Sequence, residues 1–475
     1  MIRVIPRFHL SSAFLFLIAL SAMPTLASGQ SAANAPATSL TLEQAIEYAA
    51  DHYPTVRAAI ERVNTSTADV DLARSAYLPR LDSLWQSNRG TANNVFGQLL
   101  PQSTIPSLTG PVLPAASSQS VWGSAAGALF SWEPFDFGLR HADVAGAEAA
   151  VAQARADEAL TRLDVQNVVA QAFLNAIAAQ RAVAAVQADV DRRNVLLRSV
   201  QTLVNNQLRP GADASRADAE RAAALTRLSR AQQALLIAQL TLTRMLGMTP
   251  GTAVTIAGDP LFARLPPADI MPSAATAHPL AQLRQAAVDQ ARASEQAVTR
   301  TDVPRLFVQS SVFARGSGAS ANGLLDGGID GLGFDRANWA AGVQVIFPNL
   351  FDFSGLRARK AAAAASERAN TALYDEALLT ITAEQQIAVA LLQTTRAIAT
   401  NTPVELAAAQ QSEMQARARY TAGLASIIEV ADAQSLLSQA EVQDQLARVD
   451  VWRALLAGAV AQGDLAPFIT LLRQP

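Results

Sequence analysis

The sequence predicts a mainly α-helical protein with a smaller β-sheet part, in which one structural unit occurs twice. Residues 52–81 and 277–306 place two prolines and an Arg-Leu pair at the same spacing. The junction Phe-Asp-Phe-Gly-Leu-Arg at 135–140 recurs as Phe-Asp-Phe-Ser-Gly-Leu-Arg at 351–357. Each junction precedes a long Ala-rich run whose apolar residues lie three and four positions apart, as in coiled-coil helices. We interpret these shared spacings as an internal duplication.

The first 27 residues have the features of a secretory signal peptide. Arg3 and Arg7 supply the positive region, residues 13–20 are apolar, and residues 25–27 offer small side chains at a cleavage site. A transmembrane anchor fits less well, because the apolar run is shorter than the ~18–20 residues needed to cross a bilayer. No later segment is expected to be a spanning helix, so any other crossing requires strands. We expect a flexible N-terminus at 28–40.

The composition excludes several functional classes. The chain has no cysteine, which removes disulfides, thiolate metal sites and the lipidated cysteine of a lipoprotein. Its formal net charge of −3 provides no basic surface for nucleic acid. The histidines of the mature chain are scattered, and we find neither a nucleophile elbow nor a phosphate-binding loop. We therefore expect no enzyme activity, no cofactor, no metal and no nucleic-acid partner.

Residues 41–248 form the first predicted repeat. A helix starts at Pro54, since proline suits the first helical turn, and stops at Pro79, since proline cannot continue a helix. A segment rich in Gly, Ser, Asn and Pro at 88–120 predicts a loop between two strands. The expected elements are strands at about 81–87 and 120–132, a long helix at about 136–205 and a return helix at about 213–246.

A Pro-rich linker at 249–277 precedes the second predicted repeat at 278–465. Pro403 lies inside the second long helix, where it either kinks or divides it. A short C-terminal tail follows at 466–475. The expected elements are strands at about 306–313 and 338–347 around a loop at 314–337, a long helix at about 352–421 and a return helix at about 426–460.

Each junction combines a residue that ends a strand with one that starts a helix. Pro134 follows Trp132 and cannot donate to a strand ladder, so we expect it to end the strand. The aspartates are expected to be helix N-caps, at one level of the molecule, and the phenylalanines to anchor at a membrane interface. The junction residues are Pro134, Phe135 and Asp136 in the first repeat and Phe351, Asp352 and Phe353 in the second.

The order of these elements resembles the TolC-like outer-membrane efflux duct family, in its non-lipidated branch. The stretches "LTLEQAIEYAADHYPTVRAA" at 40–59 and "YTAGLASIIEVADAQSLLSQAE" at 420–441 carry the resemblance together with the two junctions. It implies a homotrimer in the outer membrane of a Gram-negative bacterium, with twelve strands closed into one barrel and a helical tunnel in the periplasm. It also implies a periplasmic adaptor and an inner-membrane transporter of the RND or ABC type as partners.

The resemblance further implies a gate at the periplasmic tip. Tyr420 matches the family's gate tyrosine, and Glu429 and Asp432 match two acids that project carboxylate rings into the tunnel. The gate arginine of some relatives falls at Ala425, so this sequence does not support that latch. The matching acid of the first turn falls near Ser215, with Asp213 and Asp218 close but out of register. The matching adaptor-docking positions are Arg209, Pro210, Gly211, Gly423, Leu424 and Ala425.

Two functional interpretations remain open from the sequence. The first is a passive exit duct for efflux or type I secretion, opened at its periplasmic tip. The second is a non-conducting structural or adhesive coiled-coil protein of the envelope, which leaves two matched strand hairpins without a purpose. At residue level, Glu429 and Asp432 are alternatively ordinary solvated acids near a helix N-terminus, where the helix dipole favours negative charge.

Overall fold

The computed structural model describes most of the chain after the N-terminal region. The predicted signal peptide at 1–27 and residues 28–38 of the expected flexible N-terminus lie outside the described residues. The described residues are 39–91, 103–105, 118–249, 254–257, 264–267, 269–270, 273–320, 324–325, 329–349 and 351–473.

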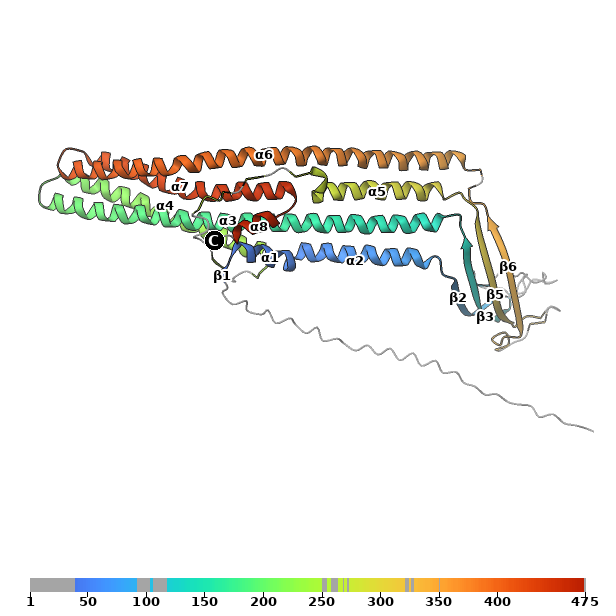
Figure 1. Ribbon diagram of the computed structural model, residues 1–475. Coiled ribbons are helices and arrows are strands. Elements are labelled where there is room, and N and C mark those ends of the chain that lie inside the picture. Colours follow the sequence, from blue (N-terminus) through green and yellow to red (C-terminus); the bar gives the residue numbers. More distant parts are fainter. Residues whose placement is uncertain are drawn as a thin grey trace, which may run out of the picture.

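Two helices of nearly equal length set the dimensions of the molecule. These are α3 (Leu139–Asn205) and α6 (Phe353–Thr421), of 67 and 69 residues. At 1.5 Å per residue each spans about 100 Å. A β-sheet lies at one end of the rod, and two helical turns lie at the opposite end, called the tip below (Figure 1).

Shorter helices pack beside the long ones in two sections. On the sheet side, α2 (Pro54–Ser75) packs on α3, and α5 (Pro279–Thr299) packs on both α3 and α6. Both begin at a proline, as the sequence predicts. On the tip side, α4 (Gly211–Met245) returns along α3, and α7 (Ile427–Gln462) returns along α6. The molecule therefore consists of two similar helical halves side by side (Figure 1).

The sheet has four antiparallel strands in the order β2-β3-β5-β6. Each strand hairpin belongs to one half of the chain, and β3 pairs with β5 to join the halves. Most of the strands extend past the expected bounds by several residues. The strands are β2 (Arg80–Thr91), β3 (Ser120–Phe135), β5 (Arg305–Ser317) and β6 (Arg336–Ile346).

The two faces of this sheet differ in polarity. Residues paired across antiparallel strands lie on the same face, so the register assigns each side chain to one face. One face, the apolar face, carries Leu81, Trp85, Phe130, Trp132, Val308, Val312, Trp339, Val343 and Val345. The other, the polar face, carries Asp82, Gln86, Asn88, Ser131, Gln309, Ser311, Arg315, Asn338 and Gln344, together with the apolar Leu84, Leu129, Phe307 and Phe313. Large side chains of the apolar face are open to solvent; Trp339 is 79% exposed.

The largest hydrophobic core lies midway along the rod. There α1 (Leu42–His52) and α8 (Ala466–Leu472) cover the centre of α3 and the end of α7. Phe173, Trp452 and Phe468 are at most 2% exposed. Burying a large side chain of this kind contributes about 1.5–3 kcal/mol, so this section anchors both halves.

Three segments expected to lack regular structure contribute to this core section. The strand β1 (Ser39–Leu40) pairs in parallel with β4 (Thr255–Ile256). A short 3-10 helix, η2 (Ala275–Ala277), ends the linker. The expected C-terminal tail forms α8, whose Phe468 ring meets the Trp452 ring edge-on at 6.3 Å between centroids. Tertiary packing gives these segments structure that their own sequence does not signal.

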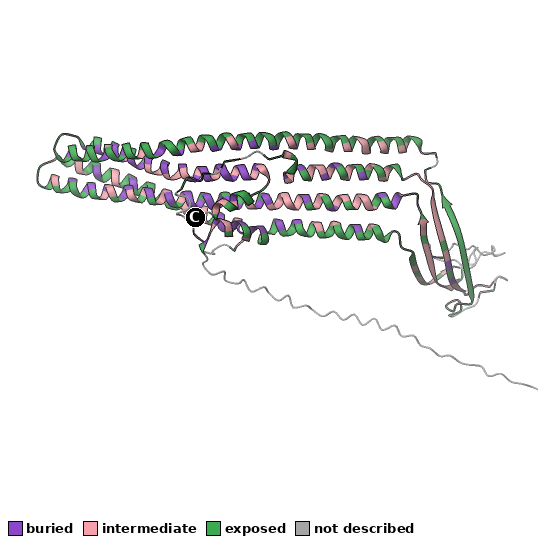
Figure 2. Cartoon of the chain, viewed as in Figure 1, coloured by how far each residue is buried: buried purple, intermediate pink, exposed green. Residues whose placement is uncertain are grey.

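Two further expectations concern the long helices. Of the two alternatives for Pro403, division of the helix is excluded, because α6 runs without interruption through it. By length and composition α3 is apolar enough to cross a membrane, contrary to the expectation that no such segment follows the predicted signal peptide. Half of the residues in its most apolar window are buried inside the molecule. Figure 2 shows buried residues concentrated on α3 and α7, while most of α6 is exposed.

Candidate functional site

The tip is formed by two helix–helix connections, called the two turns, that lie side by side. The first joins α3 to α4, and the second joins α6 to α7 (Figure 1). Gly423 adopts a positive φ of 79°, which only glycine accepts without strain, and this allows the second turn to reverse. Each turn exposes one leucine: Leu208 is 67% exposed and Leu424 is 71% exposed.

A small hydrophobic cluster holds the two turns together. It draws on all four helices, so it packs them against one another at the tip. Tyr420, at the end of α6, is 2% exposed within it. We call this set the tip cluster, and its buried members are Leu196, Leu197, Val200, Ala217, Tyr420, Ala425, Ile427 and Val430.

Tyr420 also makes polar contacts across the two turns. Its hydroxyl donates to Asp213 Oδ2 of α4 at 3.0 Å. The Arg209 guanidinium lies 4.4 Å above the centre of the Tyr420 ring and donates to the Tyr420 carbonyl oxygen. Burial and the hydrogen bond to Asp213 raise the pKa of Tyr420 to about 12, so the phenol stays protonated as a donor. We call Arg209, Asp213 and Tyr420 the latch.

Sequence reasoning placed only part of this latch. It assigned Tyr420 to a gate, and the structure places this residue at the contact between the turns. It assigned Arg209 to adaptor docking, which stays a prediction; in the structure Arg209 contacts Tyr420. Asp213 was set aside as out of register, yet it is the acid that accepts the hydroxyl. Its position was the available signal, because Asp213 is the acidic residue in the first turn of α4, whose N-cap is Pro210.

The two predicted gate acids occupy the first turns of α7. Glu429 forms a capping box with Ser426 and an ion pair with Arg419 at 3.5 Å. Asp432 is exposed and forms no ion pair within the described residues. A spacing of three places both on one side of the helix. Glu429 thus has a local role in starting α7, in addition to any role in a carboxylate ring.

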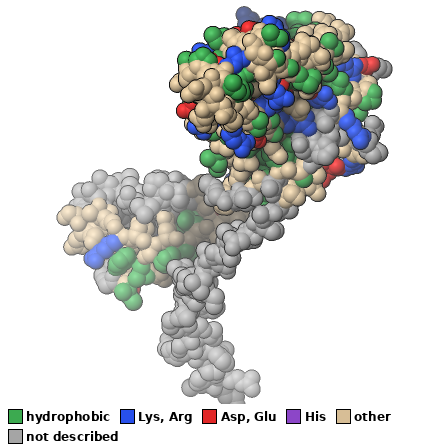
Figure 3. All heavy atoms as spheres, turned by 90° about the vertical axis from the view of Figure 1, so that its left-hand side faces the viewer, with side chains coloured by type: hydrophobic (Ala, Val, Ile, Leu, Met, Phe, Trp, Pro, Cys, Tyr) green, Lys and Arg blue, Asp and Glu red, His purple; other side chains and the backbone are tan. Residues whose placement is uncertain are grey.

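The predicted docking residues differ in their accessibility. Pro210, Gly211, Gly423 and Leu424 are exposed at the tip. Ala425 is only 9% exposed and belongs to the tip cluster, so it is not available to a partner in this conformation. Viewed from this end, the tip mixes apolar, basic and acidic side chains without a single dominant charge (Figure 3).

The two junction aspartates act differently at their helix starts, both beside the sheet. Asp352 is the N-cap of α6, and its carboxylate accepts from Gly355 N at 2.9 Å. Asp136 is not the N-cap of α3, because Gly138, with φ of 94°, takes that position. Its buried carboxylate instead accepts from the backbone N–H groups of Gly138 and Arg140 and from Arg140 Nε. Burial acts to raise the pKa of Asp136, but these hydrogen bonds outweigh it and lower the pKa.

Pro134 does not end its strand as expected. The strand β3 continues to Phe135, with a register shift between Trp132 and Phe135 that accommodates the proline. Pro134, which has no N–H, therefore lies in the irregular part of the hydrogen-bond ladder between β3 and β5. The junction aromatics are strongly exposed: Phe135 is 60%, Phe351 86% and Phe353 71% exposed.

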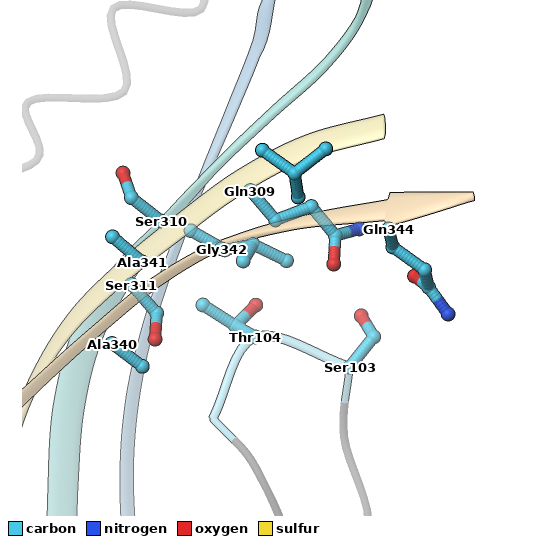
Figure 4. A pocket seen from close by; sticks show the side chains of 11 residues that line it. Ser103, Thr104, Gln309, Ser310, Ser311, Ala340, Ala341, Gly342 and Gln344 are labelled. Carbon is cyan, nitrogen blue, oxygen red and sulfur yellow. The ribbon is translucent and has the colours of Figure 1, made fainter. Parts of the chain in front are cut away.

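Residues 103–105, from the segment between β2 and β3, lie against the polar face of the sheet. Ile105 is 2% exposed and packs with Ala125 and Phe313. Ser103 and Thr104 border a cavity of about 390 Å³ that is also lined by Gln309, Ser311 and Gln344 (Figure 4). Within the described residues no group of three or more His, Asp or Glu side chains is arranged to hold a metal ion.

Comparison with known proteins identifies a family and a fold. The family model described as "Outer membrane efflux protein" matches residues 45–248 and 273–457. A comparison with curated protein sequences finds no match.

Solved structures of outer membrane channels resemble the fold. The CmeC channel of Campylobacter jejuni has a TM-score of 0.72 at 15% identity, covering 89% of this chain and 85% of CmeC. VceC of Vibrio cholerae has a TM-score of 0.69 at 19% identity, with coverage of 89% and 96%. The open state of MtrE from Neisseria gonorrhoeae has a TM-score of 0.69 at 18% identity, with coverage of 89% for both chains.

Proposed function

The chain belongs to the outer membrane efflux protein family, and we propose that three copies of it form a passive exit duct. In this proposal the sheets of three copies close into a twelve-stranded barrel in the outer membrane. The helices continue as a tunnel through the periplasm of a Gram-negative bacterium. The main support is the sheet, whose two outer edges have no partner strand among the described residues and whose apolar face is exposed.

Closure into a barrel removes both problems of the isolated sheet. An unpaired edge in lipid leaves backbone donors and acceptors without partners, and closing the barrel pairs them. The apolar face then lies against lipid, and the polar face lines the lumen. The exposed phenylalanines at the junctions lie at the level where the membrane interface is expected.

The tip closes the duct in the resting state. The latch and the tip cluster join α4 to α6 and α7, so opening requires the two turns to separate. Three copies of Glu429 and Asp432 form carboxylate rings around the entrance in this proposal. Such rings attract cations and hinder anions. The nearby Arg419 reduces the net negative charge of each Glu429.

Export needs partners that supply energy and specificity. We propose a periplasmic adaptor that docks on the exposed turns, with Leu208 and Leu424 as apolar contact points. An inner-membrane transporter of the RND or ABC type supplies the cargo. The family consists of channel proteins, and the chain acts here as a conduit without chemistry of its own.

The first experiment tests assembly and conduction together. Purified full-length protein is expected to migrate as a trimer and to conduct ions at a low level in planar bilayers. Tyr420→Phe, which removes the donor to Asp213, is expected to raise conductance several-fold. Tyr374→Phe on the same helix serves as the control and is expected to change nothing. A monomeric, non-conducting protein absent from the outer membrane favours the structural or adhesive alternative.

A second experiment tests the carboxylate rings. Glu429→Gln with Asp432→Asn is expected to reduce cation selectivity, measured as the reversal potential in a salt gradient. Arg419→Gln is expected to increase it, because Glu429 then lacks its basic neighbour. Glu376→Gln, on the sheet-side part of α6, is the control. Unchanged selectivity in the double variant contradicts the ring.

A further inference from the structure

A layer of polar and charged side chains joins the two coiled coils at some distance from the tip. The first coiled coil is α3–α4, the second is α6–α7, and α3 packs against both α4 and α7. We call this set the charged layer, and it consists of Asp189, Arg192, Arg193, Glu220, Arg227, Ser435 and Glu441.

One ion pair crosses directly between the coils. The two terminal nitrogens of Arg192 in α3 donate to the two carboxylate oxygens of Glu441 in α7, at 2.8 and 2.6 Å. Their side chains are only 24% and 19% exposed. Bidentate charge-assisted bonds are stronger than neutral ones, and partial burial limits their screening by salt. The pair therefore holds α3 and α7 in one register.

The neighbouring Arg193 contacts both coils. Its side chain is 2% exposed; Nε donates to Asp189 at 3.0 Å and Nη1 donates to Glu220 of α4 at 3.1 Å. Its Nη2 donates to Ser435 Oγ of α7 at 3.2 Å. Arg227 of α4 also donates to Asp189, at 3.0 Å.

These contacts divide unequally between the coils. Both acids that face Arg193 belong to the first coil, so that coil keeps its buried charges paired by itself. Separation of α7 at this level costs the Arg192–Glu441 pair and one hydrogen bond, and it uncovers Arg193. The buried charges of the first coil thus balance one another, and α7 contacts this coil through the Arg192–Glu441 ion pair and the Arg193–Ser435 hydrogen bond.

A weak point of α6 lies close to the same level. At 1.5 Å per residue, Arg192 and Glu441 are about 20 Å from the helix ends at the turns, and Pro403 is about 27 Å away. Proline has no N–H for the helical ladder, so bending is easier there. Thr402 Oγ1 donates to Asp444 Oδ1 at 3.2 Å, and both residues are buried. The α6 helix therefore stays attached to α7 beside its weak point.

We propose that the charged layer is the fulcrum of tip opening. The last ~20 Å of the second coil, between the layer and the turn, swings away from the first coil while the Arg192–Glu441 contact stays closed. Only the latch and the tip cluster break. This inference rests on the proposed duct function. It adds the position along the second coil at which the movement ends.

Cross-linking tests the fulcrum directly, because the chain contains no cysteine of its own. One variant, Asp213→Cys with Tyr420→Cys, permits a link across the latch. A second, Arg192→Cys with Glu441→Cys in the Tyr420→Phe background, permits a link across the layer. Each full-length protein is treated with a bifunctional methanethiosulfonate and measured in planar bilayers, before and after reduction. The four single-cysteine variants control for modification without a link.

The two links are expected to differ in effect. The latch link is expected to abolish most of the conductance, and reduction restores it. The unlinked layer variant lacks the Arg192–Glu441 pair and is expected to conduct more than Tyr420→Phe; the layer link is expected to return its conductance to the Tyr420→Phe value and not below it. A layer link that closes the channel overturns the fulcrum, because the coils then separate at that level too. Absence of conductance from every variant overturns the duct function itself, and the fulcrum with it.

A charge variant provides an independent measurement. In the Tyr420→Phe background, Glu441→Gln is expected to raise conductance further, since a longer part of the second coil then swings. Exchanging the charges, Arg192→Glu with Glu441→Arg, is expected to restore the Tyr420→Phe value. Asp450→Asn, which removes an acid paired within α7, is the matched control. Equal conductance in Glu441→Gln and its parent contradicts the proposal.

Discussion

At the residue scale, Tyr420 connects the two coiled coils through three kinds of contact. Its ring is buried in the tip cluster, its hydroxyl donates to Asp213, and its ring and carbonyl receive Arg209. Arg209 lies in the connection between α3 and α4, Asp213 lies at the start of α4, and Tyr420 lies at the end of α6. The contacts of the latch therefore depend directly on the distance between the two turns.

The raised pKa of Tyr420 predicts that deprotonation of its hydroxyl weakens the latch only in strong alkali. Its ordinary pKa is 10.0, and in the folded protein it is about 12. A raised pKa means that the protonated form stabilises the closed tip fully below pH 10, and that this stabilisation is lost as pH rises through about 12. Conductance in planar bilayers is expected to stay low to about pH 10 and then to increase.

The variant Tyr420→Phe provides the control for this titration. It lacks the ionisable hydroxyl, so its conductance is expected to be high at neutral pH and flat through the alkaline range. Tyr374→Phe is expected to behave as the unmodified protein does. An alkaline rise of equal size in Tyr420→Phe assigns the effect to another group and contradicts the prediction.

At the element scale, the two long helices begin by different means despite their similar sequences. Asp352 caps α6 at the surface, while Asp136 precedes the N-cap of α3 by two residues and pairs with the buried Arg140. Gly138 provides the left-handed turn between them. In the second half both Phe353 and Ser354 lie between Asp352 and Gly355, whereas only Phe137 lies between Asp136 and Gly138.

Substitution of the two aspartates is therefore expected to have unequal effects. Asp136→Ala leaves Arg140 buried without its carboxylate, at a cost of on the order of 3 kcal/mol. Asp352→Ala removes one exposed cap, at a cost of about 1 kcal/mol. The expected result is a larger fall in unfolding temperature for Asp136→Ala, measured in detergent. Equal falls contradict this account of the junction.

The lowered pKa of Asp136 sets the pH range for that comparison. A depressed carboxyl pKa contributes stability above its ordinary value of 3.8, and this contribution disappears as pH falls through the folded pKa. The difference between the two variants is expected to be full at neutral pH and to shrink in acid.

At the scale of the whole molecule, the sheet is the part that most requires other copies. Its apolar face is open, and neither of its edges has a partner strand in the part of the chain that the structure describes. The neighbours Val343 and Gln344 on β6 point to opposite faces, because side chains alternate along a strand. They form a matched pair for testing which face meets lipid.

We expect Val343→Arg to impair insertion and Gln344→Arg to be tolerated. An arginine on the lipid face of a barrel costs about 2–4 kcal/mol at mid-membrane, whereas the lumen is polar. The measurement is the fraction of protein recovered as trimer in the outer-membrane fraction. Impairment by Gln344→Arg alone indicates that the polar face is the one against lipid.

Much of the element order could be read from local patterns. The prolines at the starts of α2 and α5, and the glycine at the second turn, act through rules that involve only neighbouring residues. The division into two repeats stays a prediction at its boundaries, because β1, β4 and α8 belong to a core shared by both halves. These short segments carry no pattern of their own.

The candidate site was less predictable than the helices that carry it. Tyr420 was assigned from its resemblance to a family motif, but its acid partner was placed at Ser215, two positions from Asp213. Whether Glu429 and Asp432 line a channel stays a prediction. The charged layer had no signal at all, since arginines and acids at helical spacing on Ala-rich helices are usually solvated.

By itself, the sequence determined the duplication, the long amphipathic helices and the turns, because each depends on periodicity and on residues adjacent in the chain. The tertiary structure decided which side chains meet. Tyr420 and Asp213 are 207 positions apart, and Arg192 and Glu441 are 249 apart. Contacts over such separations depend on how two rods are rotated about their axes. A rotation of one residue, about 100°, replaces every partner while leaving the helical pattern intact.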